Sequence, residues 1–196
     1  MIIGVVLAGG ASSRMGVDKA TVKIEGRSML DRVAASLEVV TDRLVVAGRS
    51  EPVSGLTGLP DPAPGRAGPL AGLTAALREA GAAGAEAVIL VAVDQPFVRP
   101  ETLARLIDGY AGQAVVPVAG GVRQVTCAVY PGNWEAEAMT ELGAGGSIQS
   151  LLDRMPYTEV APDEWAAWGE DGRSWFSVDD SAALGIALGR YGSALE

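Results

Sequence analysis

The feature that most constrains the fold is a short, continuously apolar run that leads directly into glycines, hydroxyls and cations. The run is Ile2 to Val6, and the segment that follows it, Leu7 to Lys19, reads LAGGASSRMGVDK. A continuous rather than alternating apolar run is typical of a strand buried on both faces, as in a parallel sheet covered by helices. Open α/β sheets bind their ligands beyond the carboxyl ends of such strands, so the segment is predicted to be a ligand-binding loop.

The residue types in this segment favour a ligand that carries phosphate. Gly9 and Gly10 let the main chain turn sharply and bring bare N–H groups against an anion. The serines that follow can add hydroxyl donors, and Arg14 and Lys19 supply charge that neutralises phosphate oxygens during phosphoryl transfer. Taken alone, each residue type has an alternative interpretation: the two glycines could form an ordinary turn, and the cations could be solvated surface charges. The spacing matches neither a Walker loop nor the Gly-x-Gly-x-x-Gly of dinucleotide-binding folds.

Apolar runs alternate with helical patterns along the chain, which predicts an α/β fold: a three-layer sandwich with a mostly parallel, Rossmann-like central sheet. Strands are expected at 2–7, 44–47, 88–93, 114–118, 125–130 and 175–178, and helices at 29–40, 70–80, 101–110, 134–142, 148–155 and 181–188. The stretch 162–173 has no clear period and is interpreted as an irregular loop or a packed edge. With 196 residues, the chain is expected to form one domain.

Composition limits the chemistry and the partners. The chain has no histidine, so a histidine base, a histidine-containing triad and the commonest zinc ligand are excluded. The formal charge of −9 argues against a large nucleic-acid footprint. Against this acidic background, Arg14, Lys19, Lys23 and Arg27 form a local basic cluster that suits a small polyanionic substrate. The single Cys127 is interpreted as a small core residue. No apolar run is long enough to cross a membrane, and the start resembles no signal peptide, so a cytoplasmic protein without a membrane partner is expected.

A carboxylate follows the apolar run at 88–93 and is the first candidate for binding a metal ion. Asp94 stands at the carboxyl end of this predicted strand and therefore faces the same crevice as the loop after Ile2 to Val6. Magnesium is usually held by one or two carboxylates together with substrate phosphates. A helix cap or a turn aspartate before Pro96 is the alternative reading.

Three motifs, in this order, carry a resemblance to a known family. LAGGASSRMGVDK is similar to the signature loop of the nucleotidyltransferases that resemble molybdenum cofactor guanylyltransferase, a branch of the glycosyltransferase-A-like NTP transferases, with the nucleotide-diphospho-sugar transferase type of fold. Gly-Pro-Leu-Ala-Gly at 68–72 and Val-Asp-Gln-Pro-Phe at 93–97 are similar to the family's second and third motifs. The resemblance extends to about Tyr130, with a weaker similarity near the C-terminus.

The resemblance implies the reaction and the roles of individual residues. The acceptor phosphate of molybdopterin would attack the α-phosphorus of GTP and release pyrophosphate, with Mg²⁺ as cofactor. The backbone of Leu7, Ala8, Gly9 and Gly10 would hold base and ribose, Arg14 and Lys19 would clamp the phosphates, and Asp94 would carry the metal. Residues 1–112 would bind the nucleotide and 113–196 the acceptor. A homo-oligomer or a complex with another protein of the cofactor pathway is compatible with this role.

Two further positions are assigned through the resemblance. Asp61, in a proline-rich loop before Gly68, matches the family's nucleotide-contacting aspartate, and Asp61 and Gly68 are expected near the base. Gly68 and Gly72 lack side chains, so a ring or sugar could lie close to the start of the helix predicted at 70–80. A carboxylate accepts from the N1–H and exocyclic amine of guanine, which favours GTP. For Asp61, the alternative is a turn aspartate between prolines. For Gly68, the alternative is ordinary helix initiation.

The C-terminal motif departs from the family pattern. Asp179 stands where the family has an asparagine, and it is a candidate second metal ligand; an N-cap formed by Asp179, Asp180 or Ser181 is the alternative. The family's His-Pro pair is replaced around Arg123 to Thr126, which leaves the acceptor open. The alternatives are therefore a cytidylyltransferase or a sugar-phosphate nucleotidyltransferase of the same fold, or a non-catalytic nucleotide-binding protein.

Overall fold

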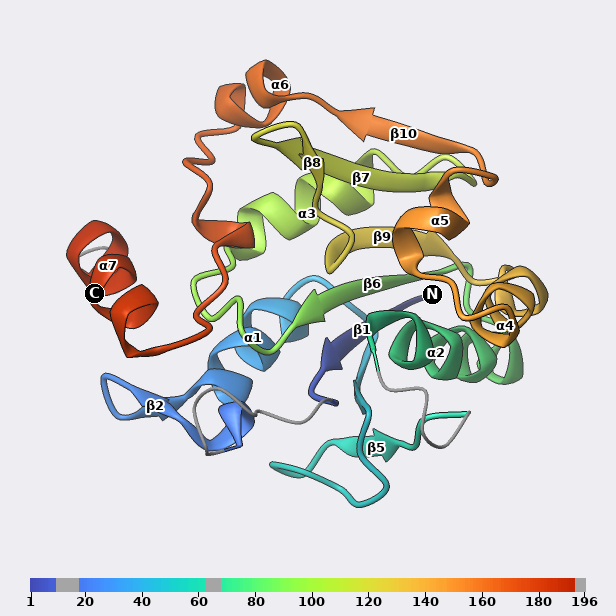
Figure 1. Ribbon diagram of the computed structural model, residues 1–196, viewed down its shortest axis with the longest axis horizontal. Coiled ribbons are helices and arrows are strands. Elements are labelled where there is room, and N and C mark those ends of the chain that lie inside the picture. Colours follow the sequence, from blue (N-terminus) through green and yellow to red (C-terminus); the bar gives the residue numbers. More distant parts are fainter. Residues whose placement is uncertain (10–17, 63–67, 193–196) are drawn as a thin grey trace.

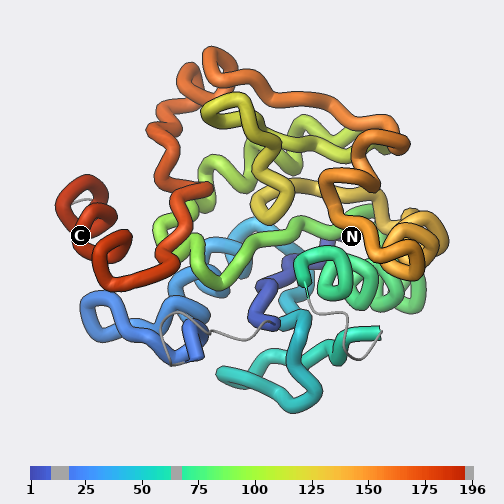
Figure 2. Tube along the Cα trace, viewed as in Figure 1, coloured from blue at the N-terminus to red at the C-terminus, as the bar shows by residue number. Residues whose placement is uncertain are grey.

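The computed structural model describes residues 1–9, 18–62 and 68–192, which form a twisted sheet with helices on both of its faces (Figures 1 and 2). The elements follow one another as β1 (Ile2–Leu7), the 3-10 helix η1 (Lys19–Thr21), β2 (Lys23–Ile24), β3 (Arg27–Ser28), α1 (Met29–Glu38), β4 (Arg43–Ala47), β5 (Thr57–Leu59), α2 (Pro69–Ala83), β6 (Ala87–Ala92) and α3 (Pro100–Asp108). The second part contains β7 (Ala114–Ala119), β8 (Val122–Arg123), β9 (Cys127–Pro131), α4 (Glu135–Gly143), α5 (Ile148–Leu152), β10 (Tyr157–Val160), α6 (Pro162–Ala167), the 3-10 helix η2 (Arg173–Trp175) and α7 (Ser181–Tyr191).

The sheet is mostly parallel, as expected. Its strands lie in the order β10-β7-β9-β6-β1-β4-β5, and β8 pairs with β7. The pairs β1 with β4, β1 with β6, β4 with β5 and β7 with β10 are parallel, whereas β9 is antiparallel to both neighbours. From β1 the chain first builds outward through β4 and β5 and then returns to place β6 on the other side of β1. The order therefore reverses between β1 and β6, where open α/β sheets bind ligands.

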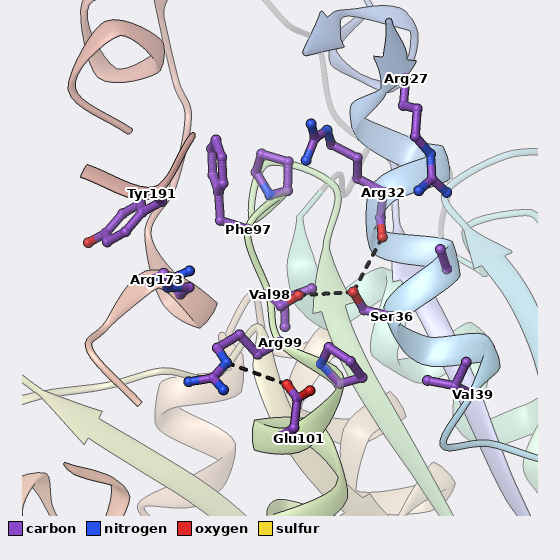
Figure 3. A pocket seen from close by; sticks show the side chains of 13 residues that line it. Arg27, Arg32, Ser36, Val39, Phe97, Val98, Arg99, Glu101, Arg173 and Tyr191 are labelled. Atoms are coloured by element: carbon purple, nitrogen blue, oxygen red, sulfur yellow. Dashed lines mark hydrogen bonds and ion pairs between the residues drawn. The ribbon is translucent and has the colours of Figure 1, made fainter. Parts of the chain in front are cut away.

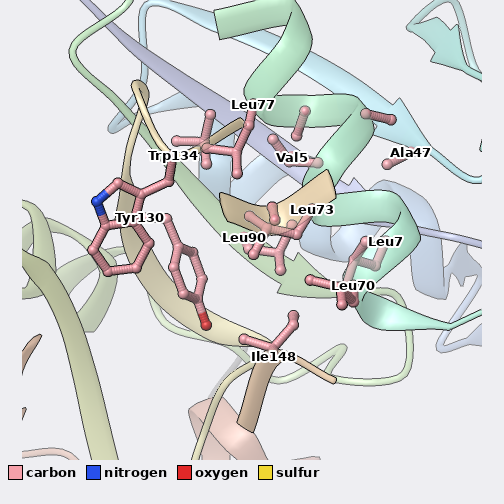
Figure 4. Packing of buried hydrophobic residues seen from close by; sticks show 14 of the residues in the cluster. Val5, Leu7, Ala47, Leu70, Leu73, Leu77, Leu90, Tyr130, Trp134 and Ile148 are labelled. Atoms are coloured by element: carbon pink, nitrogen blue, oxygen red, sulfur yellow. The ribbon is translucent and has the colours of Figure 1, made fainter. Parts of the chain in front are cut away.

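The two faces of the sheet bury separate apolar clusters. Along β1, Val5 and Leu7 contribute to the cluster under α2, α4 and α5 (Figure 4), whereas Val6 and Ala8 contribute to the cluster under α1, α3 and α7. This alternation follows from the two-residue period of a strand, and apolar residues at every position are needed because both faces are covered. The three-layer α/β sandwich predicted from the sequence is confirmed.

The structure differs from the expectations mainly near the C-terminus. Residues Pro162–Ala167 form the short helix α6 instead of an irregular loop; the helix starts with Pro162 in its first turn and buries none of its residues. The strand expected at 175–178 is absent from the described sheet. In its place, η2 ends at Trp175, and Trp165 packs against Trp175 with ring centroids 5.1 Å apart. The tryptophans of this region are therefore packing residues.

Two expectations about single features are also settled. Cys127 is fully buried in β9, and burial raises the pKa of its thiol, as suits an inert core residue. In the part of the chain that the structure covers, no helix has both the length and the apolar character needed to span a bilayer.

A buried carboxylate ties the C-terminal segment to α3. Glu170, only 4% exposed, accepts hydrogen bonds from the hydroxyls of Thr102 and Ser174, both at 2.5 Å, and from the backbone N–H of Gly172 at 2.7 Å. Glu170→Ala leaves these buried donors without an acceptor, so we expect it to lower the free energy of unfolding by about 3 kcal/mol. Urea denaturation measures this change. Glu164→Ala, an exposed glutamate on α6, is the control, and equal midpoints for the two variants would contradict the prediction.

Candidate active site

The carboxyl ends of parallel strands β1 and β6 meet at one edge of the sheet and border a cleft. Backbone hydrogen bonds join the strand ends there: the Val93 N–H donates to the Leu7 carbonyl at 2.9 Å, and the Ala8 N–H donates to the Ala47 carbonyl at 3.0 Å. The cleft beyond them has a volume of about 260 Å³. Segments far apart in the sequence line it: Leu7, Ala8, Gly9, Asp18, Lys19, Pro69, Ala92, Val93, Asp94, Thr126 and Ser177.

Lys19 lies between two carboxylates at this edge. Its Nζ is 3.1 Å from an oxygen of Asp94 and 2.7 Å from an oxygen of Asp179. Burial lowers the pKa of Lys19, but the hydrogen bonds and negative charges of Asp179 and Asp94 outweigh it and raise this pKa above its ordinary value. Lys19 therefore keeps its positive charge, and one cation and two carboxylates form a compact polar centre.

The backbone around Asp94 is fixed on several sides. The Gln95 N–H donates to the Ala92 carbonyl at 3.0 Å, and the buried Gln95 side chain accepts from the Ala92 N–H at 3.1 Å. The Val178 N–H donates to the Asp94 carbonyl at 2.7 Å. The turn after β6 is therefore closed by its own residues and held from outside by the C-terminal segment.

The hydrogen bond from Val178 to Asp94 also explains why Asp179 reaches the polar centre. Val178 is fully buried, so the next residue, Asp179, emerges beside Asp94. The cap of α7 is formed by Asp180, whose carboxylate accepts from the Ala183 N–H at 2.8 Å. Of the residues considered for the cap, Asp180 fills that role, and Asp179 faces Lys19.

A further arginine, which the sequence reasoning did not single out, lies next to this centre. The Arg49 Nε donates to the Ala8 carbonyl at 2.8 Å, and its Nη2 donates to the Asp18 carboxylate at 2.6 Å. Asp18 also accepts from the Ala20 N–H at 3.1 Å and thereby caps η1, the short helix that begins with Lys19. The hydrogen bond from Arg49 is the largest contribution that lowers the pKa of Asp18, which stays ionised.

The remaining predicted residues either do not line the cleft or lie outside the described chain. Gly68 precedes α2 and lines a neighbouring groove, while Asp61 follows β5, is half-buried and has a pKa raised by burial. Asp61 does not belong to the cleft lining formed by the described residues. Gly10 and Arg14 lie outside the described residues.

Two sequence-based interpretations change in detail. Gly72 was expected to leave space for a ring or sugar, but it is buried, and a Cβ there would clash with Leu7 Cδ2. Its small size serves the packing of α2 on β1. The basic cluster expected from Arg14 to Arg27 is divided, because Lys19 faces the cleft whereas Arg27 lines a different one.

An apolar groove adjoins the cleft through a shared residue. The groove has a volume of about 520 Å³, and Pro69 lines both spaces. Gly68 to Ala71 form one side of the groove, and Val125, Leu142 and residues 145–149 form the other. Its position and its apolar character suit the ring system of a second substrate.

Another cleft of the described chain contains none of the predicted active-site residues. It measures about 540 Å³ and is bordered by Arg27, Arg32, Arg99 and Arg173 (Figure 3). Three of these arginines already pair with carboxylates: Arg32 with Glu25, Arg99 with Glu101 and Arg173 with Asp171. The ion pairs offset most of the positive charge, so this cleft is a weaker candidate than the smaller one beside Lys19.

Comparison with known proteins identifies the family of the chain. The family model described as "MobA-like NTP transferase domain" matches residues 4–160. The chain belongs to the MobA-like NTP transferase family. It is therefore a nucleotidyltransferase. A curated relative, the molybdenum cofactor guanylyltransferase of Cereibacter sphaeroides, is 37% identical over 135 residues, which cover 66% of this chain and 69% of the relative.

Solved structures of other proteins share the fold. Molybdopterin-guanine dinucleotide biosynthesis protein A from Archaeoglobus fulgidus superposes with a TM-score of 0.79 at 24% identity, over 95% of this chain and 96% of that chain. The manganese complex of Rv0371c from Mycobacterium tuberculosis superposes with a TM-score of 0.67 at 21% identity, over 96% of this chain and 98% of that chain. At these identities the two structures establish the fold class.

Proposed function

We propose that this chain transfers the GMP moiety of GTP to the phosphate of molybdopterin and releases pyrophosphate. The observation that carries the proposal is the placement of the Lys19 ammonium between Asp94 and Asp179, beside the backbone of Leu7 to Gly9, at the point where the strand order reverses. Nucleotidyl transfer needs positioning and neutralisation of phosphate charge more than covalent chemistry from the protein. A site without histidine can provide both.

The residues that bind the nucleotide have separate roles in this proposal. The main chain of Leu7, Ala8 and Gly9 holds the base and ribose, and the Lys19 ammonium binds phosphate oxygens of GTP. Asp61 and Gly68 contribute to the nucleotide side of the site, where the Asp61 carboxylate accepts from guanine N–H groups. Gly10 and Arg14 have the roles that the family resemblance implies, as main-chain and phosphate-binding residues.

Asp94 and Asp179 are the proposed ligands of Mg²⁺. Both are hard oxygen donors, and among the described residues no group of three or more acidic, cysteine or histidine side chains competes as a metal site. Two carboxylates with room for phosphate oxygens suit magnesium, which keeps several ligand positions for water and substrate. When bound, the ion would offset the charge that develops on the phosphates.

We assign the acceptor to the second half of the chain. Residues 1–112 supply most of the nucleotide-binding cleft, to which 113–196 add Thr126 and Ser177. The second half also supplies Val125, Leu142 and 145–149 to the adjoining apolar groove. The groove meets the cleft at Pro69, so a flat ring system in the groove can direct its phosphate toward Lys19 and Asp94. Pyrophosphate release from GTP with molybdopterin as acceptor tests the complete reaction. GTP binding without any pyrophosphate release would favour a non-catalytic nucleotide-binding protein.

Nucleotide preference can be measured without the acceptor. In the presence of Mg²⁺, we expect GTP at about 100 times its Kd to stabilise the protein by about 2.7 kcal/mol, because it binds only the native state. CTP, UTP and ATP should give much smaller shifts of the melting temperature in a thermal-shift assay. A larger shift with CTP or UTP would instead support a cytidylyltransferase or a sugar-phosphate nucleotidyltransferase.

A further inference from the structure

Both ends of the signature segment 9–18 rest on the same turn, which follows β4. At the entry, Gly9 lies directly against Gly48: a Cβ on Gly48 would clash with the Gly9 Cα, and Gly48 has a φ of +85°, which residues with a side chain rarely adopt. At the exit, Asp18 is held by Arg49, the residue after Gly48. The turn therefore fixes where this segment leaves β1 and where it returns.

Arg49 connects the entry and the exit through a single side chain. Its Nε binds the Ala8 carbonyl at 2.8 Å, and its Nη2 binds Asp18 at 2.6 Å, contacts that span 41 and 31 positions of sequence. Asp18 caps η1 through the Ala20 N–H, and Lys19 is the first residue of that helix. A change in the position of Asp18 is therefore transmitted directly to the backbone of Lys19.

We propose that Arg49 is a positioning residue for nucleotidyl transfer, which holds the cleft backbone at Ala8 and the capped turn at Asp18 in the geometry that aims Lys19 at Asp94 and Asp179. The inference rests on the proposed function of this cleft. Arg49 does not line the cleft among the described residues, and it acts through Ala8 and Asp18.

A guanidinium is suited to this role in a way that an ammonium is not. Nε and Nη2 project from one rigid plane and can serve two acceptors at once, whereas lysine presents a single point charge on a flexible stem. The Arg49 and Asp18 side chains are 28% and 41% exposed, so their ion pair contributes at most about 1 kcal/mol to stability. The loss of Arg49 should therefore affect turnover far more than it affects folding.

The test compares Arg49→Met with Arg43→Met in the full-length protein. Arg43 is at the start of the same strand and pairs with Glu79 at 2.6 Å, so it controls for the loss of an arginine ion pair from β4. We expect Arg49→Met to lower kcat/KM for GTP roughly 10- to 100-fold, mainly through kcat, because small displacements of catalytic groups have effects of this size. Arg43→Met should leave kcat/KM unchanged, and Arg49→Lys should restore less than half of the lost activity.

A double-mutant cycle separates this role from a general effect on structure. Asp18→Asn should lower kcat/KM like Arg49→Met. The double variant should have a kcat/KM no lower than that of the less active single variant, because both changes break the same link. Fully additive losses, or a kcat/KM of Arg49→Met equal to that of the wild type, would overturn the inference.

Hydrogen exchange gives a result that does not depend on the identity of the substrates. The Ala20 N–H, which donates a hydrogen bond to the Asp18 carboxylate, should exchange faster in Arg49→Met than in the wild type and in Arg43→Met. Faster exchange in a protein that neither binds nor turns over GTP would leave the link at Arg49 intact and refute the proposed function alone. Unchanged exchange would overturn the link itself.

Discussion

Asp94→Asn should lower kcat by about 10²- to 10³-fold, the range seen when one group that stabilises transition-state charge is removed. The amide keeps the size of the side chain, and the turn around it is closed by Gln95 and Val178 through backbone contacts that the substitution leaves in place. What is lost is one negative charge and the main proposed magnesium ligand. Steady-state pyrophosphate release at several Mg²⁺ concentrations measures the effect, and the Mg²⁺ requirement should shift to higher concentration.

Two further variants make this result specific to Asp94. Asp179→Asn introduces the residue that the family pattern has at this position, and its amide oxygen can still bind a hard cation, so we expect a loss of less than about tenfold. Asp108→Asn, an exposed position on α3, should leave kcat unchanged. If Asp94→Asn retained wild-type kcat and the same Mg²⁺ requirement, Asp94 would not be the metal ligand.

The central part of the fold could be predicted because its strands are buried on both faces. The runs at 2–7 and 88–93 contain apolar residues or glycine at almost every position, a pattern that exposed strands do not need. β5 and β10 escaped prediction because they are only 3 and 4 residues long and carry exposed polar residues at the edges of the sheet. Their pairing depends on neighbours that are distant in the sequence.

The end of the chain was misread for a different reason. α6 buries none of its residues, so it has no apolar stripe to reveal a helical period; its signals were Pro162 and the acidic residues of the first turn. The apolar residues around Trp175 suggested a strand, but Val178 forms its hydrogen bond with the turn at Asp94 instead of a strand partner. Apolar content indicated burial correctly and the local conformation incorrectly.

Topology predicted that the segment leading to Lys19 and the residue Asp94 lie at the same edge of the sheet. Both residues come after parallel strands, and such strands end at the same edge of a sheet. Arg49 was missed because the contacts that give it a role reach across 31 and 41 positions, and a Gly-Arg pair after a strand has no distinctive pattern. Choosing between Asp179 and Asp180 also needed three-dimensional information, since either carboxylate could have capped α7.

Lys19→Met should lower kcat/KM for GTP by about 10³-fold and leave the fold intact. Methionine keeps most of the length of the side chain but removes the charge that is proposed to bind the phosphates, and such charges contribute several kcal/mol to transition-state stabilisation. The two ion pairs of Lys19 involve side chains that are 17%, 24% and 49% exposed, so each contributes about 1 kcal/mol or less to stability. Together the two pairs contribute up to about 2 kcal/mol, so the melting temperature should fall by no more than about 8 °C.

Metal binding separates this role from that of a structural counterion. In the nucleotide-free protein the Lys19 ammonium offsets the charge of Asp94 and Asp179, so removing it should tighten the binding of Mn²⁺, measured by calorimetry without nucleotide. Lys23 is an exposed lysine on β2, and Lys23→Met is the matched control. It should change neither kcat/KM for GTP nor the affinity for Mn²⁺. A Lys19→Met protein that is folded, binds Mn²⁺ more tightly and turns over GTP at the wild-type rate would restrict Lys19 to neutralising the two carboxylates. Loss of turnover together with tighter Mn²⁺ binding would place its catalytic contribution on the phosphates.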